Sequence, residues 1–175
     1  MDKEILPLLY KSMVRPHLEF ASCVWSPHLK YHIDAVERVQ RRATKLIPEI
    51  RHLTYTERLR ELDLETLEYR RKRADLIETW RILTGQHHIN LNCHCQKCPE
   101  KEMFSSPPVK STRGHSKKLF IHTSTGIRKH FFADRVASTW NKLSEATISS
   151  TTVDAFKTHL KKEIGHTAFD YRFSY

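Results

Sequence analysis

The sequence is poor in glycine, with four in 175 residues, and it contains no long apolar run. Its longest apolar stretches, such as ILPLLY at residues 5–10, are far shorter than the roughly 20 residues that a membrane-spanning helix needs. The opening MDKEIL is acidic and lacks the apolar segment of a secretory signal. Four cysteines, three of them between residues 93 and 98, do not resemble a secreted disulfide framework. We therefore expect a protein of the cytoplasm or nucleus that has no membrane partner.

Signatures of catalysis are also missing from the sequence. It has no Walker-type phosphate loop, no GxSxG elbow, no HExxH helix and no pair of adjacent aspartates of the polymerase type. The histidines, 12 in all, do not fall into a pattern with a Ser or Cys nucleophile and a carboxylate. We expect no catalytic residues, and therefore no enzyme activity from this chain on its own.

Positive charge is in clear surplus. Lys and Arg number 30 against 20 Asp and Glu, which gives a net charge of +10 and an isoelectric point near 9.6. Such a surplus favours a polyanionic partner, most often a phosphate backbone. Not one acidic residue occurs between Met103 and Ala133. The cations of this acid-free stretch are Lys110, Arg113, Lys117, Lys118, Arg128 and Lys129.

Phenylalanines accompany these cations. Phe120 could supply a surface on which bases stack, whereas Phe131 and Phe132 are expected to fill the core. For the cations, nucleic-acid contact is weighed against a loop that is basic by chance, and we favour nucleic-acid contact.

Helical periodicity dominates, so the expected fold is mainly α. Residues 1–85 are expected to form a helical bundle, 86–111 a loop or linker, and 112–175 a small basic lobe. The Thr54-x-x-Glu57 capping box predicts a helix start, and Gly85 is placed to end a helix over residues 65–83. In the lobe we expect a short β-hairpin over residues 118–132, turned at Gly126, and then two helices.

The stretch VERVQRRATKLI, Val36–Ile47, has two faces at helical spacing. One is apolar and is expected to pack in the bundle; it consists of Val36, Val39, Ala43, Leu46 and Ile47. The other is basic and consists of Arg38, Arg41, Arg42 and Lys45. This basic face is either an ordinary solvated surface or a binding surface for a polyanion. Spacing alone favours the first, and the overall charge favours the second.

The cluster CHCQKC supplies three thiols, at Cys93, Cys95 and Cys98. A tetrahedral Zn²⁺ site would need a fourth ligand, for which His87, His88, His94 and His115 are candidates. Because a second CxxC and a His pair at finger spacing are lacking, free thiols in a variable loop are the favoured interpretation. No other cofactor is expected.

Several stretches together resemble the region C-terminal to the palm in jockey-like, LINE-type (non-LTR) retrotransposon reverse transcriptases. They occur in the family's order and cover nearly the whole chain. The residues that carry the resemblance are RPHLE (Arg15–Glu19), VW (Val24, Trp25), VQRRA (Val39–Ala43), EYRR (Glu68–Arg71), TRGHS (Thr112–Ser116) and the pair Trp140, Asn141.

The resemblance implies a polymerase thumb followed by a C-terminal extension, which together hold the template–primer. It assigns RNA or duplex contact to Arg38, Arg41, Arg42, Lys45 and the basic tail, and a structural role to Trp25, Trp80 and Trp140. The family's Tyr-x-Asp-Asp motif does not occur here, and Ser144 replaces a usual proline. The chain is therefore expected to be a fragment of an RNA-directed DNA polymerase without its palm. The alternatives are a stand-alone, co-opted nucleic-acid-binding module, and a non-functional helical retroelement remnant or protein-interaction fragment.

Overall fold

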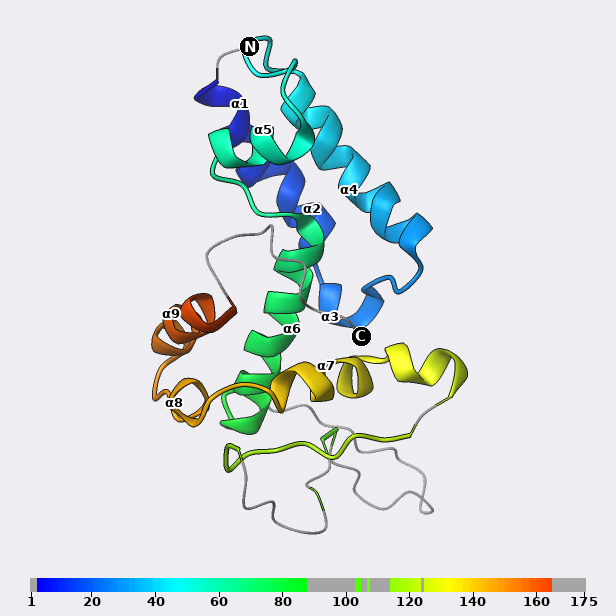
Figure 1. Cartoon of the computed structure of the whole chain (residues 1–175), viewed down its shortest axis with the longest axis vertical. Helices are drawn as coiled ribbons and strands as arrows, with labels where there is room; N and C mark the ends of the chain where they lie inside the picture. The colour runs from blue at the N-terminus through cyan, green and yellow to red at the C-terminus, as the bar shows by residue number, and fades with distance from the viewer. Residues whose placement is uncertain (1–2, 88–102, 105–106, 108–113, 124, 165–175) are drawn as a thin grey trace. The chain divides into compact units, whose positions relative to one another are not determined.

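The fold is mainly helical, as predicted, in a computed structural model that describes residues 3–87, 103–104, 107, 114–123 and 125–164 (Figure 1). No strand occurs in these residues, so the predicted β-hairpin is wrong. Its second half forms instead the 3₁₀-helix η2, Gly126–His130. The backbone N–H and C=O of Leu119, which a partner strand would engage, are bonded to the side chain of Asn141.

The described chain forms two compact units, with the boundary in the sequence between Ala74 and Asp75. This division falls inside helix α6 (Leu67–Leu83), whereas the sequence predicts a linker over residues 86–111, most of which lie outside the described residues. The reason lies in the side chains of α6. Leu67 is buried in the first unit, while Leu76 and Trp80 belong to the apolar core of the second.

The N-terminal unit begins with a helical run that changes type twice. The run consists of α1 (Ile5–Leu9), the π-helix η1 (Tyr10–Val14) and α2 (Arg15–Glu19). The wider π turn comes directly before Pro16, whose missing N–H would interrupt an α ladder. A short helix, α3 (Ser22–Trp25), follows a left-handed Ala21 with φ 51°. Trp25 is 39% exposed, and its indole N–H donates to the Phe20 carbonyl.

Helices α4 (Lys30–Lys45) and α5 (Tyr55–Glu61) complete this unit together with the first half of α6. The capping box at the start of α5 is confirmed, with Thr54 and Glu57 bonded to each other's backbone N–H. The core that α4 and α5 border is small and apolar, and consists of Ile47, Ile50, Leu59, Leu62 and Leu64.

The buried side of α4 differs from the predicted one. Val39 and Leu46 are 38% and 58% exposed, so their assignment to the core is wrong. The buried α4 side chains are polar: Glu37, Gln40 and Thr44. They lie at i, i+3 and i+7, a stripe between the predicted apolar face and the basic face of the helix.

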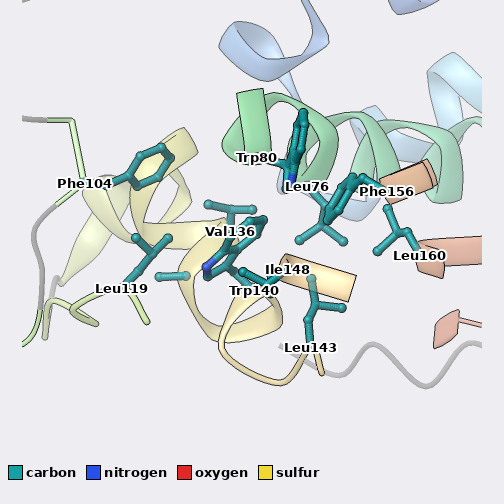
Figure 2. Close-up of a cluster of buried hydrophobic side chains, with 11 residues drawn as sticks. Leu76, Trp80, Phe104, Leu119, Val136, Trp140, Leu143, Ile148, Phe156 and Leu160 are labelled. Atoms are coloured by element: carbon teal, nitrogen blue, oxygen red, sulfur yellow. The ribbon is translucent and has the colours of Figure 1, made fainter. Parts of the chain in front are cut away.

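The C-terminal unit contains the second half of α6, η2, α7 (Phe132–Trp140), α8 (Glu145–Ile148) and α9 (Val153–Ile164). Trp80 and Phe156 stack with ring centroids 5.4 Å apart at the centre of its core (Figure 2). Val136 on α7 and Phe156 and Leu160 on α9 are buried in this core, and the structural roles predicted for Trp80 and Trp140 are confirmed. The labelled core side chains are Leu76, Trp80, Phe104, Leu119, Val136, Trp140, Leu143, Ile148, Phe156 and Leu160.

Gly85, two phenylalanines and helix α8 of the C-terminal unit can be compared with the predictions. Gly85 has φ 71°, the left-handed conformation expected after the end of α6. Phe132 packs against the core as predicted, but Phe131 is 61% exposed, so its predicted burial is wrong. Helix α8 was not predicted; it begins at Ser144, whose hydroxyl accepts from the Thr147 N–H.

Candidate nucleic-acid interface

The basic face of α4, which consists of Arg38, Arg41, Arg42 and Lys45, is exposed along its whole length. Asp34 lies nearest to this face, with its Oδ1 3.8 Å from Nη2 of Arg41. Within the part of the chain that the structure describes, no carboxylate oxygen lies within 4.0 Å of the side-chain nitrogens of the other three. Arg42 and Lys45 also lie in the last helical turn, where the helix dipole favours cations. The face is therefore a stable, largely unneutralised row of positive charge.

Arg41 is held by an aromatic ring as well as by Asp34. Its guanidinium carbon lies 5.0 Å from the centroid of the Tyr55 ring, a cation–π geometry. The Tyr55 hydroxyl is itself fixed, because it donates to the Glu37 carboxylate and accepts from Gln40 Nε2 at 3.0 Å. Tyr55 thus connects an exposed cation to the buried polar side of the same helix.

The polar stripe of α4 joins three other elements. Gln40, fully buried, accepts from the Tyr10 hydroxyl of η1 at 2.8 Å and donates to the Glu65 carbonyl at 3.0 Å. Glu37 accepts the N–H of Leu67, at the N-terminus of α6, at 3.0 Å. Thr44 accepts from Arg58 Nε of α5 at 3.1 Å. Each buried polar group therefore has a partner, and together they fix the orientation of α4.

Burial changes the proton affinity of this network. Desolvation raises the pKa of the Glu37 carboxyl, and the hydrogen bonds from Tyr55 and from the Leu67 N–H oppose that rise only in part. Burial also raises the pKa of the Tyr10 and Tyr55 hydroxyls, so both stay neutral donors at physiological pH. Sequence reasoning missed this network, although Glu37, Gln40 and Thr44 already share one face of a helical projection.

Four of the predicted cations of the C-terminal lobe are described by the structure and belong to the second unit. Lys117 and Lys129 are exposed, Lys118 is half-buried, and the Arg128 side chain is 72% exposed. Nε of Arg128 lies 4.0 Å from Oδ2 of Asp134. The remaining two predicted contacts, Lys110 and Arg113, lie outside the described residues.

Residues 114–120, here called the strap, are fastened to the α7–α8 region by side chains. Oδ1 of Asn141 accepts the Leu119 N–H at 2.9 Å, and its Nδ2 donates to the Leu119 carbonyl at 2.8 Å. Nε1 of Trp140 donates to the Lys117 carbonyl at 2.8 Å. The Trp140–Asn141 pair thus holds the strap's backbone and leaves Lys117 exposed.

Two side chains of the strap add to this attachment. His115 is buried, with its Nε2 3.0 Å from the Trp140 carbonyl oxygen. Glu145 accepts both the N–H and the hydroxyl of Ser116, and these bonds lower the pKa of its carboxyl. The strap's conformation is therefore fixed by contacts with both Trp140 and Glu145.

The candidate zinc ligands Cys93, Cys95, Cys98, His88 and His94 lie outside the described residues. The other two candidate histidines have partners of their own. His87 Nδ1 lies 2.6 Å from Glu78 Oε1, and His115 contacts the Trp140 carbonyl. Among the described residues, no group of three or more His, Cys, Asp or Glu side chains is arranged to hold a metal ion.

Comparisons with protein-family models, with curated proteins and with solved structures each give no match for this chain. The resemblance to a LINE-type reverse transcriptase therefore remains a prediction. In the described part of the chain, no helix combines the length and apolarity needed to cross a membrane.

Proposed function

We propose that this chain binds the phosphate backbone of a template–primer duplex through the basic face of α4, as the thumb and C-terminal extension of a LINE-type reverse transcriptase. The observation that carries the proposal is the row of four exposed cations on one 16-residue helix. From Arg38 to Lys45 the helix rises by about 10 Å, a length over which a duplex carries roughly six phosphate charges. A duplex segment of this length therefore carries enough phosphates for each of the four cations to contact one.

The way in which α4 is supported also favours binding over a merely solvated face. The buried polar stripe fixes the helix, and Tyr55 and Asp34 restrict Arg41 before any ligand arrives. Ordering long basic side chains costs conformational entropy on binding, so a pre-positioned guanidinium loses less of it. The chain's net charge of +10 supports the same partner class.

A charge-matched comparison tests the proposal. One variant of the full chain changes Arg38, Arg41, Arg42 and Lys45 to Gln. The control removes four positive charges elsewhere, by changing Lys142, Lys157, Lys161 and Lys162 to Gln. Binding to an RNA–DNA hybrid, measured by fluorescence anisotropy, is expected to weaken about tenfold or more in the first variant. An equal loss in the control would assign binding to net charge rather than to the α4 face.

The proposed role involves binding without nucleotidyl transfer. The Tyr-x-Asp-Asp motif that the resemblance links to two-metal catalysis does not occur in this sequence. We expect the purified chain not to extend a primed RNA template with Mg²⁺ or Mn²⁺. Template-dependent incorporation by a clean preparation would contradict this part of the proposal.

One observation favours a second candidate function, protein–protein interaction. Helices α1, η1 and α3 and the turn before α3 expose large apolar side chains. Leu8, Met13, Phe20 and Val24 are between 65% and 85% exposed. A row of exposed apolar residues is typical of a protein-binding surface. Lack of salt-sensitive nucleic-acid binding by the full chain would favour this function over the first.

A further inference from the structure

The junction between η2 and α7 presents an aromatic side chain that neither capping nor burial explains. Phe131 occupies the N-cap position of α7, where Ser, Thr, Asp or Asn is preferred, and its side chain makes no cap bond. It is also 61% exposed, and Ile127, four residues earlier, is 71% exposed. Phe131 thus departs from the residue preference of an N-cap position and from the burial expected of a large apolar side chain, without a structural gain. Such a residue is a candidate for function.

The backbone around Phe131 is firmly held. Its N–H donates to the Arg128 carbonyl at 2.9 Å, and its own carbonyl accepts the Arg135 N–H at 2.9 Å. Arg135 in turn forms a buried, two-point ion pair with Asp75 of α6, at 2.9 and 3.0 Å. The ring is therefore presented from a fixed main chain.

Two exposed cations lie close to this ring in the sequence. Arg128 and Lys129 are exposed on η2 itself. Asp134 is the acid of this junction; it is only 10% exposed and lies 4.0 Å from Arg128. Phe120, at the end of the strap, is 40% exposed and packs edge-on against His122 at 4.9 Å. The unit thus exposes aromatic side chains, and at Phe131 an accessible ring is adjacent in sequence to two exposed cations.

We propose that the η2–α7 junction binds unpaired nucleotides, with Phe131 stacking on a base and Arg128 and Lys129 contacting the flanking phosphates. Every base has a π-face, so stacking gives affinity without a requirement for a particular sequence. A duplex offers such a face only at its ends, which makes single-stranded nucleic acid the partner. This surface is separate in residues and chemistry from the basic face of α4, which is proposed to read only the duplex backbone.

An anionic lipid surface is the other partner that exposed apolar and basic residues suit. Interfacial helices bury a long apolar stripe, however, and η2 has only five residues. We therefore argue for nucleic acid and treat lipid binding as an outcome of the test.

The test uses the full chain and two single-stranded oligonucleotides of equal length and charge, one with bases and one fully abasic. The wild type is expected to bind the base-containing strand about fivefold or more tightly than the abasic one. Phe131→Leu should abolish this preference and leave abasic binding unchanged, while Phe131→Tyr should keep it. Phe20→Leu, at an even more exposed phenylalanine in the other unit, is the matched control and should change nothing.

Three results would overturn the proposal. They are equal affinity of the wild type for both strands, an equal loss for both strands in Phe131→Leu, and binding to anionic phosphatidylserine vesicles that depends on Phe131 without any base preference. The α4 Gln variant should retain the base preference. A failure of the duplex proposal is thereby distinguishable from a failure of this one.

Discussion

The guanidinium carbon of Arg41 lies 5.0 Å from the centroid of the Tyr55 ring, so a cation of α4 rests against an aromatic side chain of α5. The same tyrosine donates its hydroxyl proton to Glu37, which is buried one helical turn before Arg41 on α4. The exposed and buried faces of one helix are thus coupled through a residue that neither face contains. This arrangement makes Tyr55 a positioning residue for the proposed phosphate contact.

Removing the ring should weaken duplex binding through Arg41. Tyr55→Leu is expected to lower affinity for an RNA–DNA hybrid about two- to fivefold, the equivalent of one exposed cation–π contact. In an Arg41→Gln background the same change should have no further effect, because the cation that the ring positions is absent. An equal loss in both backgrounds, measured by a double-mutant cycle, would reduce Tyr55 to a purely structural role.

The buried carboxyl of Glu37 should make stability depend on pH. Its pKa is raised in the folded state, so the folded chain holds a proton that the unfolded chain has already released. Its contribution to stability is therefore greatest below the unfolded pKa of about 4.3 and is lost as the pH rises through the higher folded value. Urea unfolding of Glu37→Gln, which keeps an acceptor but cannot titrate, should show a flatter pH profile than wild type. Parallel profiles would contradict the raised pKa.

Adjacent apolar residues at the end of α4 should differ sharply in their effect on stability. Ile47 is fully buried in the core of the N-terminal unit, so Ile47→Ala should lower the free energy of unfolding by about 2–5 kcal/mol. Leu46→Ala and Val39→Ala should each cost less than about 1 kcal/mol, because these side chains are substantially exposed. Chemical denaturation measures all three; comparable losses at Leu46 and Ile47 would place the buried face of α4 where the apolar stripe alone predicts it.

Loss of the Asn141 side chain should release the strap. Asn141→Ala removes both hydrogen bonds to the Leu119 backbone. The peptide bonds that follow the neighbouring Lys117 and Lys118 are trypsin cleavage sites. Limited trypsin digestion should therefore cut after these lysines faster in the variant, because local opening becomes easier. Ser149→Ala, at an exposed position after α8, serves as the control. Unchanged cleavage at residues 117 and 118 would show that Trp140 and Glu145 hold the strap without Asn141.

Local signals predicted local structure well. The capping box at Thr54 and the left-handed Gly85 each depend on residues a few positions apart, so the sequence contains the whole cause. The polar stripe of α4 does not, because Gln40 is satisfied by Tyr10 and Glu65, 30 and 25 residues away. Without those partners, burial of three polar side chains could not be expected over burial of Val39 and Leu46.

The same reasoning explains the errors in the C-terminal lobe. A hairpin turned at Gly126 was predicted over residues 118–132, but the Leu119 backbone is satisfied by Asn141, 22 residues away. The burial of Phe131 was predicted from its apolar character alone, and adjacent Phe132 occupies the inward position instead. At the candidate site, the exposure of the α4 cations followed from helical spacing. The support of Arg41 by Tyr55 required the tertiary fold.

The salt dependence of duplex binding shows directly whether the basic face of α4 contacts phosphates. Each phosphate contact releases condensed counterions, so with four to six contacts the plot of log K against log salt should have a slope of roughly −3 to −5 for the wild type. Changing Arg38, Arg41, Arg42 and Lys45 to Gln keeps good helix formers at all four positions, so the fold should persist. We expect a slope shallower by roughly three in this variant, and an unchanged slope in the charge-matched Lys142, Lys157, Lys161 and Lys162 control. Parallel lines for the wild type and the α4 variant would show that the basic face of α4 is only a solvated surface.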